Sequence, residues 1–138
     1  MIGVLIIAHG NLGDSLIHCA SHVMGNRPLQ LEYLGVNNDD DLLLLLPKAQ
    51  KLVNQLNQGD GVLVLSDMYG ASPANLAAKL LKANEVVGVA GINLPMLVRV
   101  LTYRNGNLCL LAEKAVSGGR EGVVQYDQNS CDHYEKTK

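Results

Sequence analysis

Residues 2–10 of the chain are Ile2-Gly3-Val4-Leu5-Ile6-Ile7-Ala8-His9-Gly10, and they decide the fold. The first seven carry no polar side chain, and an apolar run of this length is typical of a strand that is buried on both faces. Such strands belong to parallel sheets that are covered by helices on either side. His9 and Gly10 then follow the carboxyl end of the strand, which is the edge where sheets of this class bind their ligands.

Strand and helix patterns alternate along the rest of the chain. Further short apolar runs predict strands at residues 29–34, 62–65, 86–90 and 108–111. Apolar residues at helical spacing predict helices that begin near Asp14 or Ser15, after Asp41, at Ser72-Pro73 with Ser72 as N-cap, and at Pro95, with a last, glycine-interrupted helix at residues 116–124. Pro47 lies inside the second helix, which we expect it to kink or split.

This alternation predicts an α/β fold with an open, doubly wound sheet and helices on both faces. A chain of 138 residues fits one domain, and the patterned part covers residues 1–126. Residues 127–138 are polar and show no periodicity, so we expect them to form a flexible C-terminal tail.

The composition excludes some classes of function. Hydrophobic residues make up 48% and charged residues 17% of the chain, without Trp or Phe, so we expect an aliphatic core. The net charge is −2 and no basic stripe is present, which argues against nucleic-acid binding. No apolar run reaches the roughly 18 residues that span a bilayer, and the first strand follows no basic, cleavable leader. We therefore expect a cytoplasmic protein with no direct membrane insertion.

Three loops are predicted to meet at the ligand-binding edge of the sheet, at residues 9–10, 67–72 and 91–94. His9 is the candidate reactive group, because a neutral imidazole serves as nucleophile, base or ligand near neutral pH. Asp67 ends a neighbouring strand and is placed to accept a hydrogen bond from one ring nitrogen, which would leave the other nitrogen free to attack. The alternatives are a structural histidine at a strand end and an aspartate that caps a turn.

Gly70-Ala71-Ser72-Pro73 adds a candidate anion-binding element. Small residues let the backbone approach an anion, and the helix that follows offers unpaired N–H groups and the positive end of its dipole. The Ser72 hydroxyl is a further donor, and Gly10 leaves space beside His9. Together these groups suit phosphoryl transfer, which depends on positioning and oriented donors. No Walker motif or kinase glycine loop is present, so neither a nucleotide donor nor a cofactor is expected.

Other reactive side chains fit no pattern of this strength. His18 and His22 have the spacing of two metal ligands on a helix, but no third ligand accompanies them, and we expect no metal site. Cys19 and Cys109 are expected to be small buried thiols, and Cys131 lies in the tail.

Three apolar residues near the predicted site are candidates for a protein contact. Met68 and Tyr69 lie in the loop that follows Asp67, and Met96 follows Pro95. They would form an exposed apolar rim for a protein partner, with local packing as the alternative.

Four motifs together resemble the mannose-family IIA domain of the bacterial phosphoenolpyruvate:sugar phosphotransferase system. They are Ile7-Ala8-His9-Gly10, Asp67-Met68-Tyr69-Gly70-Ala71-Ser72-Pro73, Gly91-Ile92-Asn93-Leu94-Pro95-Met96-Leu97 and Gly119-Arg120-Glu121-Gly122-Val123. The resemblance covers about residues 1–126, with the motifs in the order of the family. His-Gly alone is common, whereas the four motifs at compatible spacing are highly specific.

The resemblance implies a phosphotransferase with a phosphohistidine intermediate. His9 would receive a phosphoryl group on Nε2 from the phosphocarrier protein HPr, with Asp67 holding Nδ1, and would pass it to a IIB domain in sugar uptake. The backbone amides of Gly70-Ala71-Ser72 and the Ser72 hydroxyl would bind the group. The chain ends without the linker and IIB domain that some family members carry, so we expect the acceptor on a separate chain.

The resemblance also implies an architecture. The family fold is an open sheet of four parallel strands and one antiparallel edge strand, for which residues 108–111 are the candidate. Family members are commonly homodimers that associate through the C-terminal region.

Three positions depart from the family pattern. Family members often carry Thr or Ser where Met68 stands, Trp where Tyr69 stands and Gly where Ala71 stands. The loss of a hydroxyl at position 68 removes one phosphoryl contact or supporting bond. It leaves the histidine, its orienting acid and the anion-binding helix in place.

Three other functions fit parts of the pattern. A regulatory phosphoprotein would use the same His9 chemistry without a transport partner, and the phosphodonor of a dihydroxyacetone kinase would differ only in its acceptor. A tetrapyrrole metal chelatase also begins with a hydrophobic strand and His-Gly, but it usually continues with Ser-Arg, where this chain has Asn11-Leu12. Gene neighbourhood separates regulation from transport, which the sequence alone does not.

Overall fold

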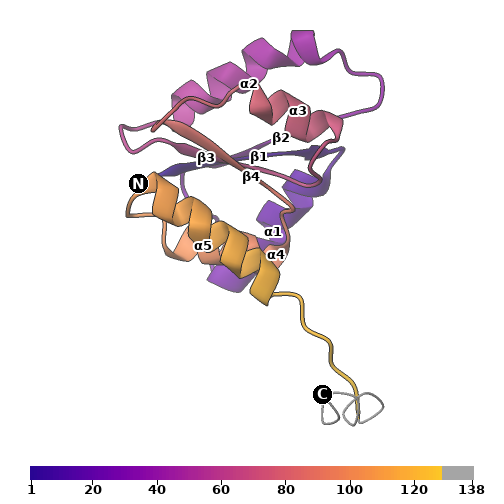
Figure 1. Ribbon diagram of the computed structural model, residues 1–138, viewed down its shortest axis with the longest axis vertical. Helices are drawn as coiled ribbons and strands as arrows, with labels where there is room; N and C mark the ends of the chain where they lie inside the picture. Colours follow the sequence, from indigo (N-terminus) through magenta and orange to yellow (C-terminus); the bar gives the residue numbers. More distant parts are fainter. Residues whose placement is uncertain (129–138) are drawn as a thin grey trace.

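The computed structural model describes residues 1–128 and places one sheet between two layers of helices (Figure 1). The strands are β1 (Gly3–His9), β2 (Leu31–Val36), β3 (Val62–Ser66) and β4 (Val86–Ala90). The helices are α1 (Leu12–Met24), α2 (Leu42–Leu56), α3 (Ser72–Ala78), α4 (Leu94–Thr102) and α5 (Leu108–Glu121). The strand order is β2-β1-β3-β4 and all neighbours are parallel. The predicted α/β fold with helices on both faces is confirmed.

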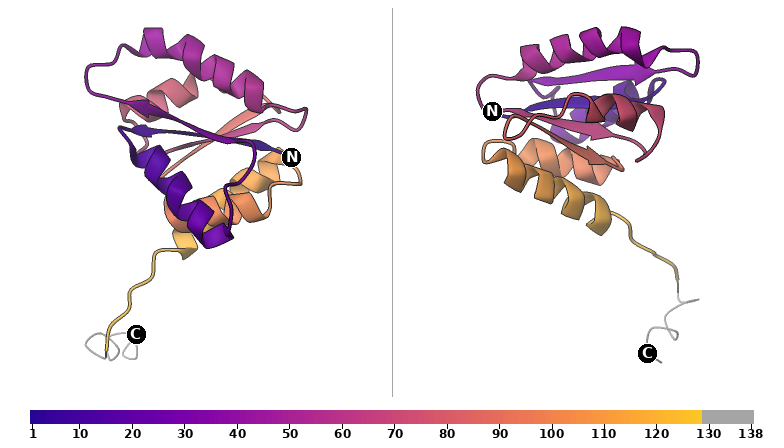
Figure 2. Two further views of the ribbon diagram at one scale, coloured as in Figure 1. Left: turned by 180° about the vertical axis from the view of Figure 1, so that it is seen from behind. Right: turned by 45° about the horizontal axis from the view of Figure 1, so that its top comes forward.

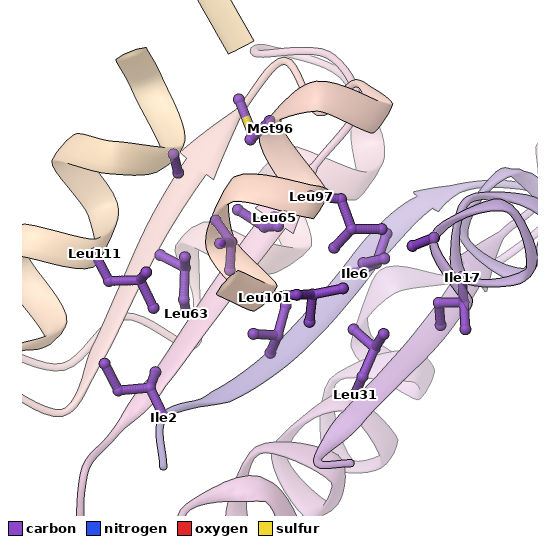
Figure 3. Close-up of a cluster of buried hydrophobic side chains, with 14 of the residues drawn as sticks. Ile2, Ile6, Ile17, Leu31, Leu63, Leu65, Met96, Leu97, Leu101 and Leu111 are labelled. Atoms are coloured by element: carbon purple, nitrogen blue, oxygen red, sulfur yellow. The ribbon is translucent and has the colours of Figure 1, made fainter. Parts of the chain in front are cut away.

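Alternate residues of the central strand β1 point into two separate cores. Val4, Ile6 and Ala8 are buried together with residues of α1, α4 and α5 in the core that Figure 3 shows. Leu5 and Ile7 are buried on the opposite face with residues of α2 and α3. Figure 2 shows the two helical layers from behind and with the top of the molecule turned forward. Because both faces of β1 are covered, the positions between Gly3 and His9 all carry apolar side chains.

The chain leaves β1 and β3 in opposite directions across the sheet. α1 leads from β1 to β2, whereas α3 leads from β3 to β4 on the other side. Parallel crossovers are right-handed almost without exception, so helices that lead in opposite directions fall on opposite faces. The point between β1 and β3 is therefore the switch point at which sheets of this class bind their ligands. Ile7 is paired with Ser66 there, which brings the carboxyl ends of both strands together.

Residues 108–111, which we expected to form an antiparallel edge strand, instead form the first turn of α5. The Asn107 side chain caps this helix by accepting a hydrogen bond from a backbone N–H three residues later, at 3.1 Å. Leu108, Leu111 and Ala115 then lie on one buried face at helical spacing. The strand prediction was wrong because four apolar residues fit either a strand or a helical turn, and the cap decides between them. Within residues 1–128, the sheet contains no antiparallel strand.

Some predicted helix boundaries also change. α5 continues without a break to Glu121 and so includes most of the helix expected at residues 116–124. α2 runs through Pro47 as one helix, so the alternative of a split is wrong. α3 has Ala71 as its N-cap and Ser72 as its first residue, one position earlier than expected.

Cys19 on α1 and Cys109 on α5 are exposed, so the expectation that both are buried is wrong. Cys131 and most of the tail expected at residues 127–138 lie outside the described residues. None of the helices in residues 1–128 is both long enough and apolar enough to cross a membrane.

Arg104 closes the end of the sheet that lies opposite His9. Its guanidinium donates hydrogen bonds to the backbone carbonyls of Ile2, Leu29 and Gln30, at 3.0, 2.6 and 2.6 Å. Burial lowers the pKa of Arg104 to about 10, so the side chain still carries its charge at neutral pH. The three bonds tie together the segments that lead into β1 and β2.

Replacement of Arg104 by Met is expected to lower the free energy of unfolding by about 3 kcal/mol, because three backbone carbonyls lose their hydrogen bonds to a buried, charged donor. Urea titration at neutral pH measures this change as a lower midpoint at a constant slope. Arg27→Met is the control, because Arg27 donates to one backbone carbonyl, that of Leu31 at 3.1 Å, where Arg104 donates to three. Its ion pair with Glu32 is long, at 3.8 Å, and about half exposed. Equal stability of the two variants would contradict the role assigned to Arg104.

Candidate active site

His9 is the last residue of β1, and its side chain contacts Asp67 directly after β3. The ring Nδ1 lies 2.6 Å from Asp67 Oδ2, and the His9 backbone N–H donates to the same oxygen at 3.1 Å. One carboxylate oxygen thus holds both the ring and the backbone of His9. The structure brings together the two residues that the sequence singled out as nucleophile and orienting acid.

The surroundings of Asp67 keep its carboxylate ionised. Its side chain is only 13% exposed, and this burial by itself raises the pKa of Asp67. The hydrogen bonds from the ring and backbone of His9, the charge of a protonated His9 ring and a backbone bond within the loop together outweigh burial, so the pKa lies below 3.8. The second oxygen, Oδ1, accepts a hydrogen bond from the Met68 backbone N–H at 3.0 Å. At neutral pH, Asp67 therefore acts only as an acceptor.

An ionised carboxylate fixes the tautomer of His9. Because Asp67 can only accept, Nδ1 of the neutral ring carries the proton and donates it. Nε2 then keeps its lone pair, and no group within residues 1–128 forms a hydrogen bond to it. The His9 side chain is 47% exposed, so a reactant can reach this nitrogen. An oriented nucleophile requires an arrangement of this kind.

The turn after His9 lies directly on β2. Gly10 has a φ of +53° and donates its N–H to the Val36 carbonyl at 3.0 Å. The Gly10 carbonyl oxygen lies 2.3 Å from the point where a Cβ on Gly35 would stand. Gly35 was not predicted as a site residue, although a glycine inside a strand is a usual sign of a close backbone approach.

The predicted anion-binding loop follows β3, the neighbour of β1. Gly70 has a φ of +87° and open space around it. Ala71, the N-cap of α3, has a methyl side chain that cannot accept a hydrogen bond, so the first N–H groups of α3 lack a side-chain cap. Ser72 is exposed at the first position of the helix. These groups suit an anion, and their role in binding one stays a prediction.

The residues expected to form an exposed apolar rim are in different environments. Met68 and Tyr69 are largely exposed in the loop after β3. Met96 is 3% exposed and belongs to the core, so its placement on the rim is wrong. Met96 points inward because Gly119 of α5 makes room for it: a Cβ on Gly119 would lie 2.7 Å from Met96 Cε.

Comparison with known proteins identifies the family. Residues 3–112 match EIIA-man, which is described as the PTS system fructose IIA component, where PTS is the sugar phosphotransferase system. The chain belongs to this family. It is therefore a member of the IIA components of the sugar phosphotransferase system.

Individual relatives agree with the family. The PTS system mannose-specific EIIAB component of Escherichia coli (strain K12) is 31% identical over 125 residues, which span 88% of the IIA chain and 38% of that relative. The PTS system fructose-specific EIIA component of Bacillus subtilis (strain 168) is 27% identical over 142 residues, which span 100% of the IIA chain and 92% of the relative. The mannose/sorbose-specific IIA subunit from Enterococcus faecalis shares the fold, with a TM-score of 0.83 at 19% identity, over 94% of the IIA chain and 97% of that structure.

Two of the four motifs form a packing contact in the IIA chain. Asn93 Nδ2 donates to the Gly119 carbonyl at 3.1 Å, and Asn93 Oδ1 caps α4 by accepting from the Met96 N–H at 2.9 Å. Gly122 lies so close to Pro95 that a Cβ would stand 2.5 Å from it. The motifs at residues 91–97 and 119–123 therefore join α4 to α5, which a linear pattern does not reveal.

The two helical histidines, His18 and His22, are exposed on α1. Across residues 1–128, no three His, Cys, Asp or Glu side chains form a group that could hold a metal ion.

The bonds between Asp67 and His9 are expected to make the stability of the IIA chain fall in acid. The folded state holds the Asp67 pKa below 3.8, so around pH 4 and below the unfolded chain binds more protons at this group. The contribution is complete well above the unfolded pKa and is lost as the pH falls through the folded pKa. Asp67→Asn should cost about 1 kcal/mol at neutral pH and progressively less below about pH 4, as measured by urea unfolding.

The matched control is Asp39→Asn, which removes an exposed carboxylate on the loop after β2. Its stability relative to the wild type should not follow the acid profile of Asp67→Asn. A difference between Asp67→Asn and the wild type that stays constant from neutral pH to about pH 2 would show that the charge of Asp67 does not stabilise the fold.

Proposed function

We propose that the IIA chain is a cytoplasmic phosphohistidine carrier, which accepts a phosphoryl group from HPr on His9 and passes it to a IIB domain in sugar uptake. The observation that carries the proposal is the 2.6 Å contact between His9 Nδ1 and Asp67 Oδ2. This contact leaves Nε2 as a nucleophile on an accessible edge of the sheet. Membership of the EIIA-man family supports the same role.

The transfer step follows from the tautomer. The Nε2 lone pair attacks phosphorus, and the bond from phosphorus to the donor breaks as the new P–N bond forms, so that the donor keeps the bonding electron pair. The proton stays on Nδ1, and the phosphorylated ring of His9 gains positive charge. Asp67 stabilises that charge through its short contact with Nδ1. Transfer to the acceptor is the same displacement with a nucleophile of the acceptor attacking phosphorus.

The residues proposed to surround the phosphoryl group on His9 have two roles: some leave room for it and others donate hydrogen bonds to it. The Gly10 N–H already bonds to β2, so Gly10 provides room for the group, and the Ala71 N–H bonds to the Met68 carbonyl at a long 3.3 Å. The donors proposed for the phosphoryl oxygens are the N–H groups of Gly70 and Ser72 and the Ser72 hydroxyl, with Ala71 as a weaker contributor. Oriented donors of this kind stabilise the charge of the transferred group.

Two protein partners must reach the same histidine in turn. We propose that Met68 and Tyr69, exposed at 62% and 89% beside Asp67, form the apolar contact rim for both. A IIB domain is the proposed acceptor, in line with the name EIIAB of the Escherichia coli relative.

Incubation with phosphoenolpyruvate, enzyme I and HPr is expected to add one acid-labile phosphoryl group to the wild-type IIA chain, as seen in its intact mass. His9→Ala should abolish the gain. Asp67→Ala should slow it about 10- to 100-fold, because the tautomer is no longer fixed and a charged hydrogen bond is lost. His22→Ala, which removes an exposed histidine of α1, should label at the wild-type rate.

Full labelling of His9→Ala would show that another residue is the nucleophile. Failure of the wild type to label with several HPr proteins, including one from its own organism, would exclude the carrier function.

We also propose that the IIA chain forms a homodimer through its C-terminal region. β4 is the last strand of the sheet, and a groove of about 630 Å³ runs beside it, lined by Gly88 and Val89 of β4 and by residues of α5. The segment after α5 exposes Val124 and Tyr126, at 69% and 92%. A second copy that covers the edge of β4 would remove both this edge and these side chains from water.

The double variant Val124→Asp/Tyr126→Asp is expected to weaken the dimer at least about tenfold, because charges replace apolar contacts at the interface. Sedimentation or light scattering across a concentration series measures the dissociation constant. Val23→Asp, a change at an exposed valine of α1, should leave it unchanged. A monomeric wild type, or a double variant that dimerises normally, would refute the proposed interface.

A further inference from the structure

We infer that Gly35 is a positioning residue for His9, because its missing side chain makes room for the turn that sets the histidine against Asp67. The inference rests on the proposed role of His9 as the phosphoryl carrier. Gly35 lies in β2, where it is paired with Ala8, the residue before His9 in β1. Gly35 belongs to none of the four motifs. Its importance follows from the Gly10 backbone, which lies close against it.

The contact between Gly35 and Gly10 leaves no room for a methyl group. A Cβ on Gly35 would lie 2.3 Å from the Gly10 carbonyl oxygen and 3.3 Å from its carbonyl carbon. Ordinary contact begins at 3.4 Å, so alanine at this position would have to displace the carbonyl by about 1 Å. The obstacle is backbone, which cannot rotate away as the end of a side chain can.

The whole connection from β1 to α1 rests on β2. The Gly10 N–H bonds to the Val36 carbonyl at 3.0 Å, immediately beyond Gly35. The start of α1 also lies close to β2. A Cβ on Gly13 would stand 2.8 Å from Cβ of Tyr33, which lies two residues before Gly35 in the strand. At Gly35, a side chain on the strand would meet the backbone of the connection itself.

A displacement of Gly10 passes directly to His9, the preceding residue. His9 is held to Asp67 by its ring and its backbone N–H, and Gly10 is held to Val36. A shift of about 1 Å at the Gly10 carbonyl that is passed on to His9 lengthens one or more of these bonds. Where the Nδ1 bond lengthens, the tautomer is no longer fixed, and a misplacement of this size can slow a reaction about 100-fold.

Gly3 offers a matched control for the test. A Cβ on Gly3 would lie 2.4 Å from the Leu56 carbonyl oxygen, which is the same kind of clash with backbone. Gly3, however, is the first residue of β1 and lies at the opposite end of this strand from His9. Gly3→Ala therefore reports the effect of such a clash on the fold alone. Because β2 is an edge strand, we expect Gly35→Ala to fold as well, which thermal unfolding of both variants checks.

The first readout needs no phosphoryl donor. ¹⁵N NMR of the His9 ring reports which nitrogen carries the proton. The wild type and Gly3→Ala should show Nδ1 protonated and Nε2 unprotonated. Gly35→Ala should show a mixture of the two tautomers, which a loss of stability by itself would not produce.

The second readout is the rate of phosphorylation by phosphoramidate, a small donor that requires no protein docking. Its P–N bond breaks as the bond to His9 Nε2 forms, and ammonia leaves with the electron pair and a proton from water. Gly35→Ala should react about 10- to 100-fold more slowly than Gly3→Ala. The comparison isolates the placement of His9 from the contact with HPr.

Three outcomes would decide against the inference or against its premise. Equal tautomers and equal rates in the two variants would overturn it, and Gly35 would then only fill space. A Gly35→Ala chain that fails to fold while Gly3→Ala folds would overturn it too, because the glycine would then serve the whole fold. If the wild type accepts no phosphoryl group from any donor, the carrier function fails, whereas the NMR comparison still decides whether Gly35 positions His9.

Discussion

The site depends on one carboxylate oxygen, Asp67 Oδ2, which accepts from both the ring and the backbone of His9. The contact exists only because β1 and β3 are parallel neighbours in one register, in which Ile7 is paired with Ser66. A slip of one residue would exchange the side chains that face the two cores, so the close packing of each core opposes it. The apolar runs that form the core therefore also set the geometry of the polar pair at its edge.

The sequence predicted the strands, the layers and the site edge because each depends on a local signal. A buried parallel strand is continuously apolar, and its last residue marks the ligand-binding edge, which is how His9 and Asp67 were found. Residues 108–111 were misassigned because four residues are too short to separate a period of two from one of 3.6. The cap at Asn107, which settles the matter, is a single side chain whose contact is visible only in the structure.

The other features that the sequence did not reveal were missed for two different reasons. The Asn93–Gly119 bond and the burial of Met96 join segments far apart in the chain, so no local period reveals them. The motif that contains Met96 drew attention as a candidate partner contact, whereas its residues pack α4 on α5. Gly35 was missed because it lies outside every motif. Only the contact with the Gly10 carbonyl shows why a side chain is excluded at this position.

Polar groups at the two ends of the sheet differ in their exposure to solvent and in their role. At the end near Ile2, Arg104 is 4% exposed and satisfies three backbone carbonyls, so the polar groups there stabilise the fold. At the other end Asp67 is sheltered, while the His9 ring that it orients is half exposed. The proposed carrier function, in which two proteins meet His9 in turn, needs a reactive atom that is reachable and a charge that is fixed. Asp67 follows β3 and His9 ends the neighbouring strand β1, and this placement meets both requirements. The pairing of the strands fixes the position of the acid, while His9, the last residue of β1, projects into solvent.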